Sequence, residues 1–123
     1  MGIMKLIIAG SRTLYPSYGF ILSAIKMLQP GTITEIVSGG AEGVDQEAEH
    51  FASHLSDIPF KLFSADWKTH GKAAGPIRNA QMAEYSDALL LIWDGESRGS
   101  ANMLTEMKKR AKPIYQVIIK GDK

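Results

Sequence analysis

The sequence contains no cysteine, which excludes disulfide bonds and zinc sites built on thiolates. It also lacks a long apolar run, because the longest one, residues 88–93, is too short to cross a bilayer. Residues 1–5 carry no signal-peptide pattern. We therefore expect a cytoplasmic protein with no membrane partner.

The chain also has no excess of charge of one sign. Its 14 basic and 13 acidic residues give a net charge of +1, whereas a sequence-independent grip on DNA or RNA needs a clearly basic surface. The composition thus argues against nucleic acid as a partner. With 45% hydrophobic residues, the 123-residue chain is long enough to bury a core, and we expect one domain over residues 1–123.

Short apolar runs alternate with helical patterns along the chain. Strands are expected at residues 4–9, 35–37, 59–63, 87–93 and 113–119, and a helix follows each of the first four, the first helix closing at Pro30 and Gly31. This alternation predicts an α/β fold, a parallel sheet with helices on both faces. Ligands bind such sheets beyond the carboxyl ends of the strands, so the loops that follow strands should form the site.

A glycine-rich turn, SGGAEGVD at residues 38–45, joins the second strand to its helix. Glycines let the backbone approach a ligand closely, and the start of a helix attracts anions. We predict a phosphate-binding cradle here, with Asp45 as an acceptor for ribose hydroxyls; the alternative is an ordinary strand-to-helix turn. The candidate ligand-binding residues are Ser38, Gly39, Gly40, Ala41, Gly43 and Asp45.

Two further loops each combine a glycine, a hydroxyl and a cation. They are Gly10, Ser11 and Arg12 after the first strand, and Ser97, Arg98, Gly99 and Ser100 before the last helix. Guanidinium groups and helix starts both bind phosphate. The alternative for Arg12 is pairing with a surface carboxylate. Together the three loops predict a nucleotide-like ligand, and no cofactor is expected.

The polar and aromatic segment at residues 64–75 is long for a plain connector, and long loops in compact domains are usually functional. Trp67 can stack on a base; alternatively, it packs on the domain as a lid residue. Ligand contacts in this region are expected from Lys72, Gly75, Arg78 and Asn79.

Neither a metal site nor a catalytic pair follows from spacing alone. His50 and His54 are four residues apart next to Glu47 but lack an HExxH pattern, so no metal site is predicted. Asp94 and Glu106 are the carboxylates at the expected ligand-binding edge with a catalytic interpretation, and Asp94 can equally bind ribose.

Four strings resemble one protein family in order and spacing. They are IIAGSR at residues 7–12, SGGAEGVD at 38–45, Trp67 with GKAAGPIRN at 71–79, and WDGESRGS at 93–100. The resemblance is to the cpYpsA-related SLOG proteins, of the SMF/DprA and LOG superfamily of Rossmann-like domains. It implies the strand order 3-2-1-4-5, a pocket for nucleoside monophosphates, NAD or ADP-ribose derivatives, a dimer, and a role in bacterial conflict with phages.

The same superfamily includes the LOG phosphoribohydrolases, whose motif PGGxGTxxE supplies a glutamate that acts with a separate arginine. Here Met103 is at the position of that glutamate, and Arg78 is similar in place to the arginine. The resemblance therefore implies binding of a nucleotide-derived molecule by a sensor or sequestering protein. The alternative is a nucleotide N-glycosidase that uses Arg78 with Asp94 or Glu106. A third hypothesis is single-stranded DNA binding, as in DprA relatives.

Overall fold

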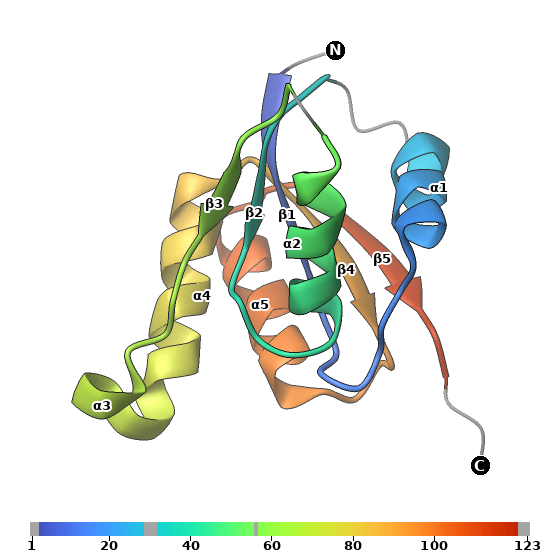
Figure 1. The fold of residues 1–123 in the computed structure, drawn as a ribbon. Helices are drawn as coiled ribbons and strands as arrows, with labels where there is room; N and C mark the ends of the chain where they lie inside the picture. Colours follow the sequence, from blue (N-terminus) through green and yellow to red (C-terminus); the bar gives the residue numbers. More distant parts are fainter. Residues whose placement is uncertain (1–2, 29–31, 56, 121–123) are drawn as a thin grey trace.

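The computed structural model describes residues 3–28, 32–55 and 57–120 and forms three layers, with a sheet between two layers of helices (Figure 1). The sheet is parallel, with the order β3-β2-β1-β4-β5. Both the fold class and the strand order are confirmed. The strands are β1 (Ile3–Gly10), β2 (Thr32–Ser38), β3 (Phe60–Leu62), β4 (Ala88–Trp93) and β5 (Ile114–Ile118).

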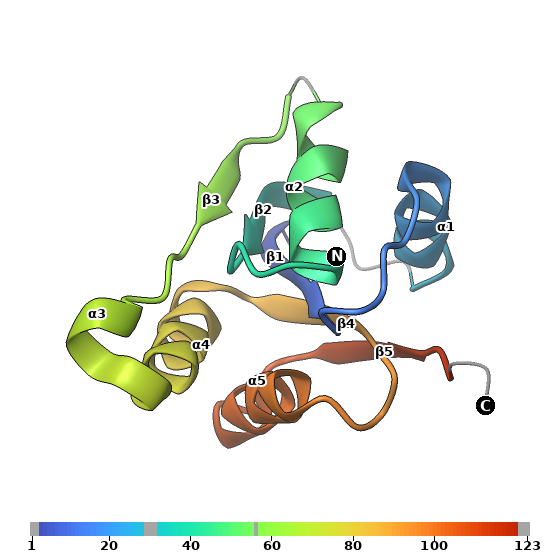
Figure 2. The ribbon, with the colours of Figure 1, turned by 60° about the horizontal axis from the view of Figure 1, so that its bottom comes forward.

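Helices cover both faces of the sheet. One face carries α1 (Tyr18–Leu28) and α2 (Val44–Ser53), and the opposite face carries α4 (Ala74–Tyr85) and α5 (Arg98–Lys109) (Figure 2). A short helix, α3 (Trp67–His70), and a 3-10 turn, η1 (Gly71–Ala73), lie between β3 and α4.

The apolar runs explain the middle of the sheet. All six residues of β4 are buried, because β4 lies between β1 and β5 and is covered on both faces. Alternate residues of β1 enter two cores: Leu6 and Ile8 pack toward α1 and α2, and Ile7 and Ala9 pack toward α4 and α5. The two edge strands, β3 and β5, keep exposed positions.

Helix boundaries differ from the expected ones where side chains cap the backbone. Proline is favoured in the first turn of a helix, so Pro16 predicts a helix start there. The first helix instead begins at Tyr18, where the Ser17 hydroxyl accepts the Phe20 N–H at 3.1 Å. Part of the expected loop at residues 64–75 is helical, because Asp66 caps α3 by accepting the Thr69 N–H at 3.1 Å. The expected helix end at Pro30 and Gly31 lies outside the described residues.

None of the helices found in the described ranges is long and apolar enough to cross a membrane. The cytoplasmic location and the dimer stay predictions.

Candidate functional site

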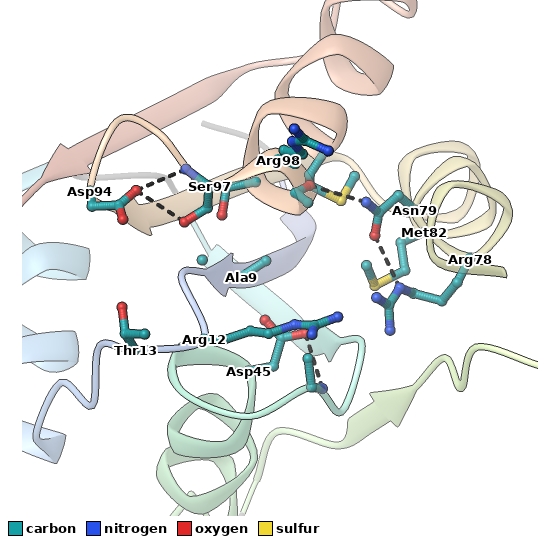
Figure 3. Close-up of a pocket in the computed structure, with 15 residues that line it drawn as sticks. Ala9, Arg12, Thr13, Asp45, Arg78, Asn79, Met82, Asp94, Ser97 and Arg98 are labelled. Atoms are coloured by element: carbon teal, nitrogen blue, oxygen red, sulfur yellow. Dashed lines mark hydrogen bonds between the residues drawn. The ribbon is translucent and has the colours of Figure 1, made fainter. Parts of the chain in front are cut away.

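Two adjoining cavities open beyond the carboxyl ends of the strands, and Figure 3 shows residues that line the first of them. Cavity 1, of about 420 Å³, lies at the ends of β1 and β4, whose following helices pack on opposite faces of the sheet. In α/β sheets, a ligand-binding crevice forms where the loops after two neighbouring strands lead to helices on opposite faces. Cavity 2, of about 330 Å³, lies between the glycine-rich turn, the segment after β3, and α4. Arg12, Ala41 and Arg78 line both cavities.

The start of α5 supplies hydrogen-bond donors to cavity 1. Its first residues, Arg98, Gly99 and Ser100, line the cavity together with Ser97. The first N–H groups of a helix have no partner within the helix and carry its partial positive charge. The Ser100 side chain adds a hydroxyl that is buried, with the residue 4% exposed, and has no hydrogen-bond partner among the described residues. A buried hydroxyl without a partner is uncommon, and one at the wall of a cavity can turn toward a ligand atom and hydrogen-bond to it.

Three arginines line cavity 1, and they differ in whether their side chains are hydrogen-bonded. Arg78 is held in place: Nη1 donates to the Gly39 carbonyl, and Nε donates to Asn79 Oδ1 at 3.0 Å. Within the described part of the chain, the side chains of Arg12 and Arg98 have neither a hydrogen-bond nor an ion-pair partner. The alternative pairing of Arg12 with a surface carboxylate is therefore not observed there. Arg12 and Arg98 offer two charges that an anion in the cavity can use.

Asp45 brings an unusual carboxyl group to the same cavity. The residue is 5% exposed, and burial raises its pKa to about 6, against the opposing effects of the Arg78 charge and of backbone N–H groups. Burial in turn lowers the pKa of Arg78, and the neighbouring charge of Arg12 acts in the same direction. Near neutral pH the cavity thus holds an ionised but poorly solvated carboxylate beside its arginines.

The glycine-rich turn is not the open phosphate cradle that we predicted. The Val44 N–H donates to the Ser11 carbonyl at 3.1 Å, and the Ala41 N–H donates to Asp45 Oδ2 at 3.4 Å. Gly43, with φ at +76°, lines neither cavity, and a side chain there would overlap the Ser11 carbonyl. The start of α2 is therefore closed by the loop after β1, whereas the start of α5 lines cavity 1.

The loop after β4 is built around Asp94. Its Oδ1 accepts hydrogen bonds from the Glu96 N–H at 2.8 Å, the Ser97 N–H at 2.9 Å and the Ser97 hydroxyl at 3.0 Å. These bonds lower the pKa of Asp94 to about 2. Ser11 Oγ accepts the Asp94 N–H at 3.1 Å and lies 2.7 Å from Ser97 Oγ, which ties the loops after β1 and β4 together. Asp94 lines cavity 1 and stays ionised near neutral pH. It is therefore suited to accept hydrogen bonds from hydroxyl groups and not to donate a proton.

Comparison with known proteins gives one clear relative. No protein-family model matches the chain. The chain is 37% identical over 93 residues to the Gene 61 protein of Mycobacterium phage D29, and the match covers 72% of each chain. The chain belongs to the Gene 61 protein family.

The fold of this Gene 61 family protein also occurs in DNA processing protein A of Helicobacter pylori. That structure, described for its unique single-stranded DNA binding mode, matches with a TM-score of 0.65 at 20% identity, covering 98% of this chain and 68% of that one. We therefore correct the expectation that argued against nucleic acid. A protein of the same Rossmann-like fold binds single-stranded DNA, so a net charge of +1 does not rule out that partner.

Most of the predicted site residues of this Gene 61 family protein lie at one of the two cavities. Cavity 1 collects Gly10, Arg12, Ala41, Asp45, Arg78, Asn79, Asp94, Ser97, Arg98, Gly99 and Ser100. Cavity 2 collects Gly39, Gly40 and Trp67, with the shared Arg12, Ala41 and Arg78. Lining neither cavity are Ser11, Ser38, Gly43, Lys72, Gly75 and Glu106. Ser38, for example, donates its hydroxyl to the Ile8 carbonyl at 2.8 Å and so joins β2 to β1.

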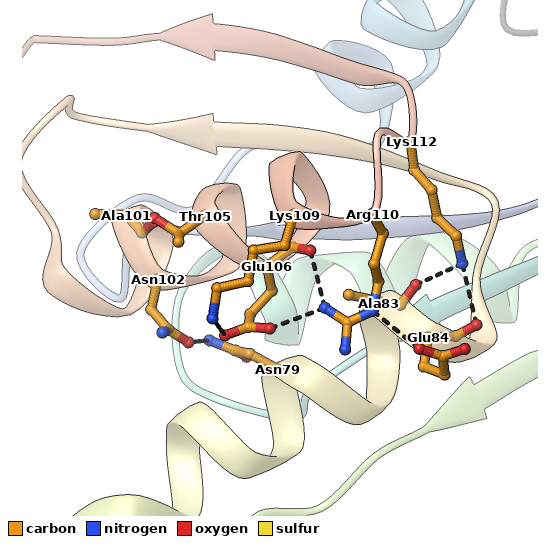
Figure 4. A network of polar contacts seen from close by, with 10 residues as sticks. All are labelled: Asn79, Ala83, Glu84, Ala101, Asn102, Thr105, Glu106, Lys109, Arg110 and Lys112. Carbon is orange, nitrogen blue, oxygen red and sulfur yellow. Dashed lines mark hydrogen bonds and ion pairs between the residues drawn. The ribbon is translucent and has the colours of Figure 1, made fainter.

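In this Gene 61 family protein, Glu106 lies outside cavity 1, in a network of polar contacts (Figure 4). Its Oε1 accepts from Arg110 Nη1 at 2.9 Å and its Oε2 pairs with Lys109 Nζ at 3.3 Å. Arg110 continues to Glu84 of α4 at 3.0 Å, so Glu106 belongs to a network that joins α4 to α5. The catalytic placement of Glu106 is corrected, because the side chain is turned to these cations and away from cavity 1.

Sequence patterns alone missed the apolar wall of cavity 1. Met82 and Met103 line it beside Ala9, and both methionines are also part of the core between the sheet, α4 and α5. The position of each methionine within its own helix indicates that it packs in the core. It does not reveal that one side of the side chain faces a cavity. In cavity 2 the missed residues are Glu42, which adjoins Ala41 along the chain, and Leu62, Ser64 and Ala65, which precede Trp67.

Proposed function

We propose that the protein binds a nucleotide-derived small molecule, of the nucleoside monophosphate, NAD or ADP-ribose type, with a phosphate at the start of α5. The observation that carries this proposal is the Ser100 hydroxyl, buried and without a partner, at a helix start that lines cavity 1. A phosphate oxygen supplies the missing acceptor, and helix starts are common phosphate sites.

The charges of the cavity support an anionic ligand. Arg12 and Arg98 have no partner among the described residues, so a phosphate can take hydrogen bonds from either guanidinium without breaking an existing ion pair. Asp45 and Asp94 oppose a phosphate directly beside them, but a carboxylate can accept hydrogen bonds from the hydroxyl groups of a sugar. The proposed arrangement therefore has phosphate near α5 and a sugar toward the carboxylates.

Mass spectrometry tests this proposal after incubation of the protein with AMP, NAD and ADP-ribose. We expect at least one intact nucleotide to be retained, and we expect Arg98→Ala to weaken the retention. Lys108→Ala is the control, because Lys108 is a cation at the opposite end of the same helix and lines neither cavity. Equal retention by the Arg98 variant and the wild type would mean that the charge of Arg98 does not contribute to nucleotide binding.

Hydrolysis of a nucleotide at its glycosidic bond is the alternative for the same cavity. It is less well supported, because Met103 lines cavity 1 where the resemblance places a glutamate, and Asp94 already accepts three hydrogen bonds. The incubation above distinguishes the two functions, since only a hydrolase releases free base. If free base appears and Arg78→Ala abolishes it, an enzyme is indicated.

Single-stranded DNA binding is a second candidate, and the fold shared with DNA processing protein A supports it. Three arginines and two carboxylates line cavity 1, so cations outnumber anions there although the whole chain is nearly neutral. A strand that uses several phosphates binds with an affinity that falls steeply with salt, whereas one phosphate in cavity 1 gives a shallow dependence. Titration with an oligonucleotide at two salt concentrations separates these cases.

We further propose that residues 1–123 form one SLOG domain of the cpYpsA-related type that acts as a sensor or a sequestering protein. The four sequence strings and the Rossmann-like fold support this assignment. A sequestering protein retains its ligand intact over long incubation, which the same mass spectra measure.

A further inference from the structure

Cavity 2 shares one wall with cavity 1, and that wall is basic. Arg12 and Arg78 line both cavities, and they are close enough for the charge of Arg12 to lower the pKa of Arg78. Two neighbouring guanidiniums favour an anion that contacts both of them. A ligand that occupies both cavities would lie beside the residues they share, Arg12, Ala41 and Arg78.

The opposite side of cavity 2 offers a flat apolar surface. Trp67 lines the cavity and is 51% exposed, although large aromatic side chains usually bury more of their surface. The edge of its indole ring lies close to Gly75 of α4, where an added side-chain carbon would be 3.4 Å from the ring. Leu62 and Ala65 add apolar wall beside it. An exposed indole beside apolar side chains is suited to stack on a planar ring.

Each of the two cavities has the size of a small-molecule pocket. Their volumes, about 420 and about 330 Å³, both fall in the range of about 300–1,000 Å³ that small-molecule pockets occupy. We infer that cavity 2 is a second subsite, which holds a nucleobase against Trp67. The ligand then consists of two nucleoside units joined through phosphate, with the joining phosphate between Arg12 and Arg78. This inference rests on the proposed binding of a nucleotide phosphate at α5.

Two sources have this chemistry: a free dinucleotide, and a stretch of single-stranded nucleic acid. Titration calorimetry separates them with three probes, which are AMP, NAD and a six-residue deoxyadenosine oligonucleotide. We expect the wild-type protein to bind NAD or the oligonucleotide more tightly than AMP. Tighter binding of NAD than of the oligonucleotide identifies a free dinucleotide as the source, and the reverse order identifies a strand.

Trp67→Ala tests the subsite itself. It should weaken binding of the preferred two-unit ligand by about 5- to 150-fold, the factor that corresponds to one stacked base, and should change AMP binding less than about twofold. Trp67→Phe keeps an aromatic face and should retain most of the affinity. Tyr15→Ala is the matched control, because Tyr15 is 57% exposed and lines neither cavity.

Different outcomes would contradict the second base subsite and the phosphate site at α5. If Trp67→Ala changes neither two-unit ligand, or weakens AMP as strongly as NAD, cavity 2 is not a second base subsite, while phosphate binding at α5 stands. If wild-type protein binds none of the three probes, the proposed function and the subsite both fail. Thermal melting followed by circular dichroism checks that each variant is folded.

Discussion

Asp45 and Arg78 both approach Gly39 at the position where a side chain would begin. A side-chain carbon on Gly39 would lie 2.5 Å from Arg78 Nη1 and 2.9 Å from Asp45 Oδ2. The close approach of a cation and a carboxyl group to one glycine explains why this position has no side chain. Arg78 also bonds the Gly39 carbonyl, so the arrangement fixes the guanidinium between the two cavities.

The buried Asp45 should make folding stability depend on pH. Its pKa is 3.8 in an unfolded chain and about 6 in the folded protein, so the folded state keeps a proton that the unfolded state loses between these values. The contribution of Asp45 to stability therefore falls as pH rises from about 4 to about 6, by at most about 3 kcal/mol.

Urea unfolding of the wild type and of Asp45→Asn at pH 4, 5, 6 and 7 measures this effect. Asparagine cannot titrate, so the stability of the variant relative to the wild type should increase with pH over that range. A constant difference between the two proteins would mean that the pKa of Asp45 is not raised. Other carboxyl groups, such as Asp94 with its lowered pKa, contribute equally to both proteins.

A side chain at Gly43 should destabilise the protein, whereas a side chain at Gly99 should be tolerated. Gly43→Ala places a side-chain carbon against the Ser11 carbonyl at a positive φ and should cost more than about 2 kcal/mol of unfolding free energy. Gly99 has no atom within 4 Å of the corresponding position, so Gly99→Ala should change stability by less than about 1 kcal/mol. Chemical denaturation compares them, and equal losses would contradict the packing of the loop after β1 on α2.

Glu106 should matter for stability and not for the ligand. Glu106→Gln weakens the pairs with Arg110 and Lys109 and should lower the unfolding free energy by about 1 kcal/mol, because these pairs are only partly shielded from solvent. Nucleotide binding and any release of free base should stay at wild-type levels. Loss of either activity at unchanged stability would restore Glu106 as a site residue.

The sequence was sufficient for the sheet because its signals are local. Continuous apolar runs such as residues 88–93 mark buried strands, and glycine-rich turns between strand and helix mark the ligand-binding edge. The role of each loop was not predictable, because it depends on contacts between loops distant in sequence. The start of α2 is closed by the Ser11 carbonyl, and Asp94 is held with Ser97 beside Ser11. Glu106 was misplaced because helical spacing alone does not show that Arg110 and Lys109 turn it away from the cavity.

Ser86 and Ser100 form a matched pair for the central claim, phosphate binding at α5. Both are buried serines whose hydroxyls have no partner among the described residues, but only Ser100 lines cavity 1. Titration calorimetry with the nucleotide that the wild type retains should therefore compare Ser100→Ala with Ser86→Ala.

Loss of one hydrogen bond to a charged group is worth about 1.5–3 kcal/mol, so Ser100→Ala should weaken binding by about tenfold or more. Ser86→Ala should bind like the wild type, and neither variant should lose stability, because each removes a buried hydroxyl that has no partner. Wild-type affinity in Ser100→Ala, or equal weakening in both variants, would contradict a phosphate at the start of α5.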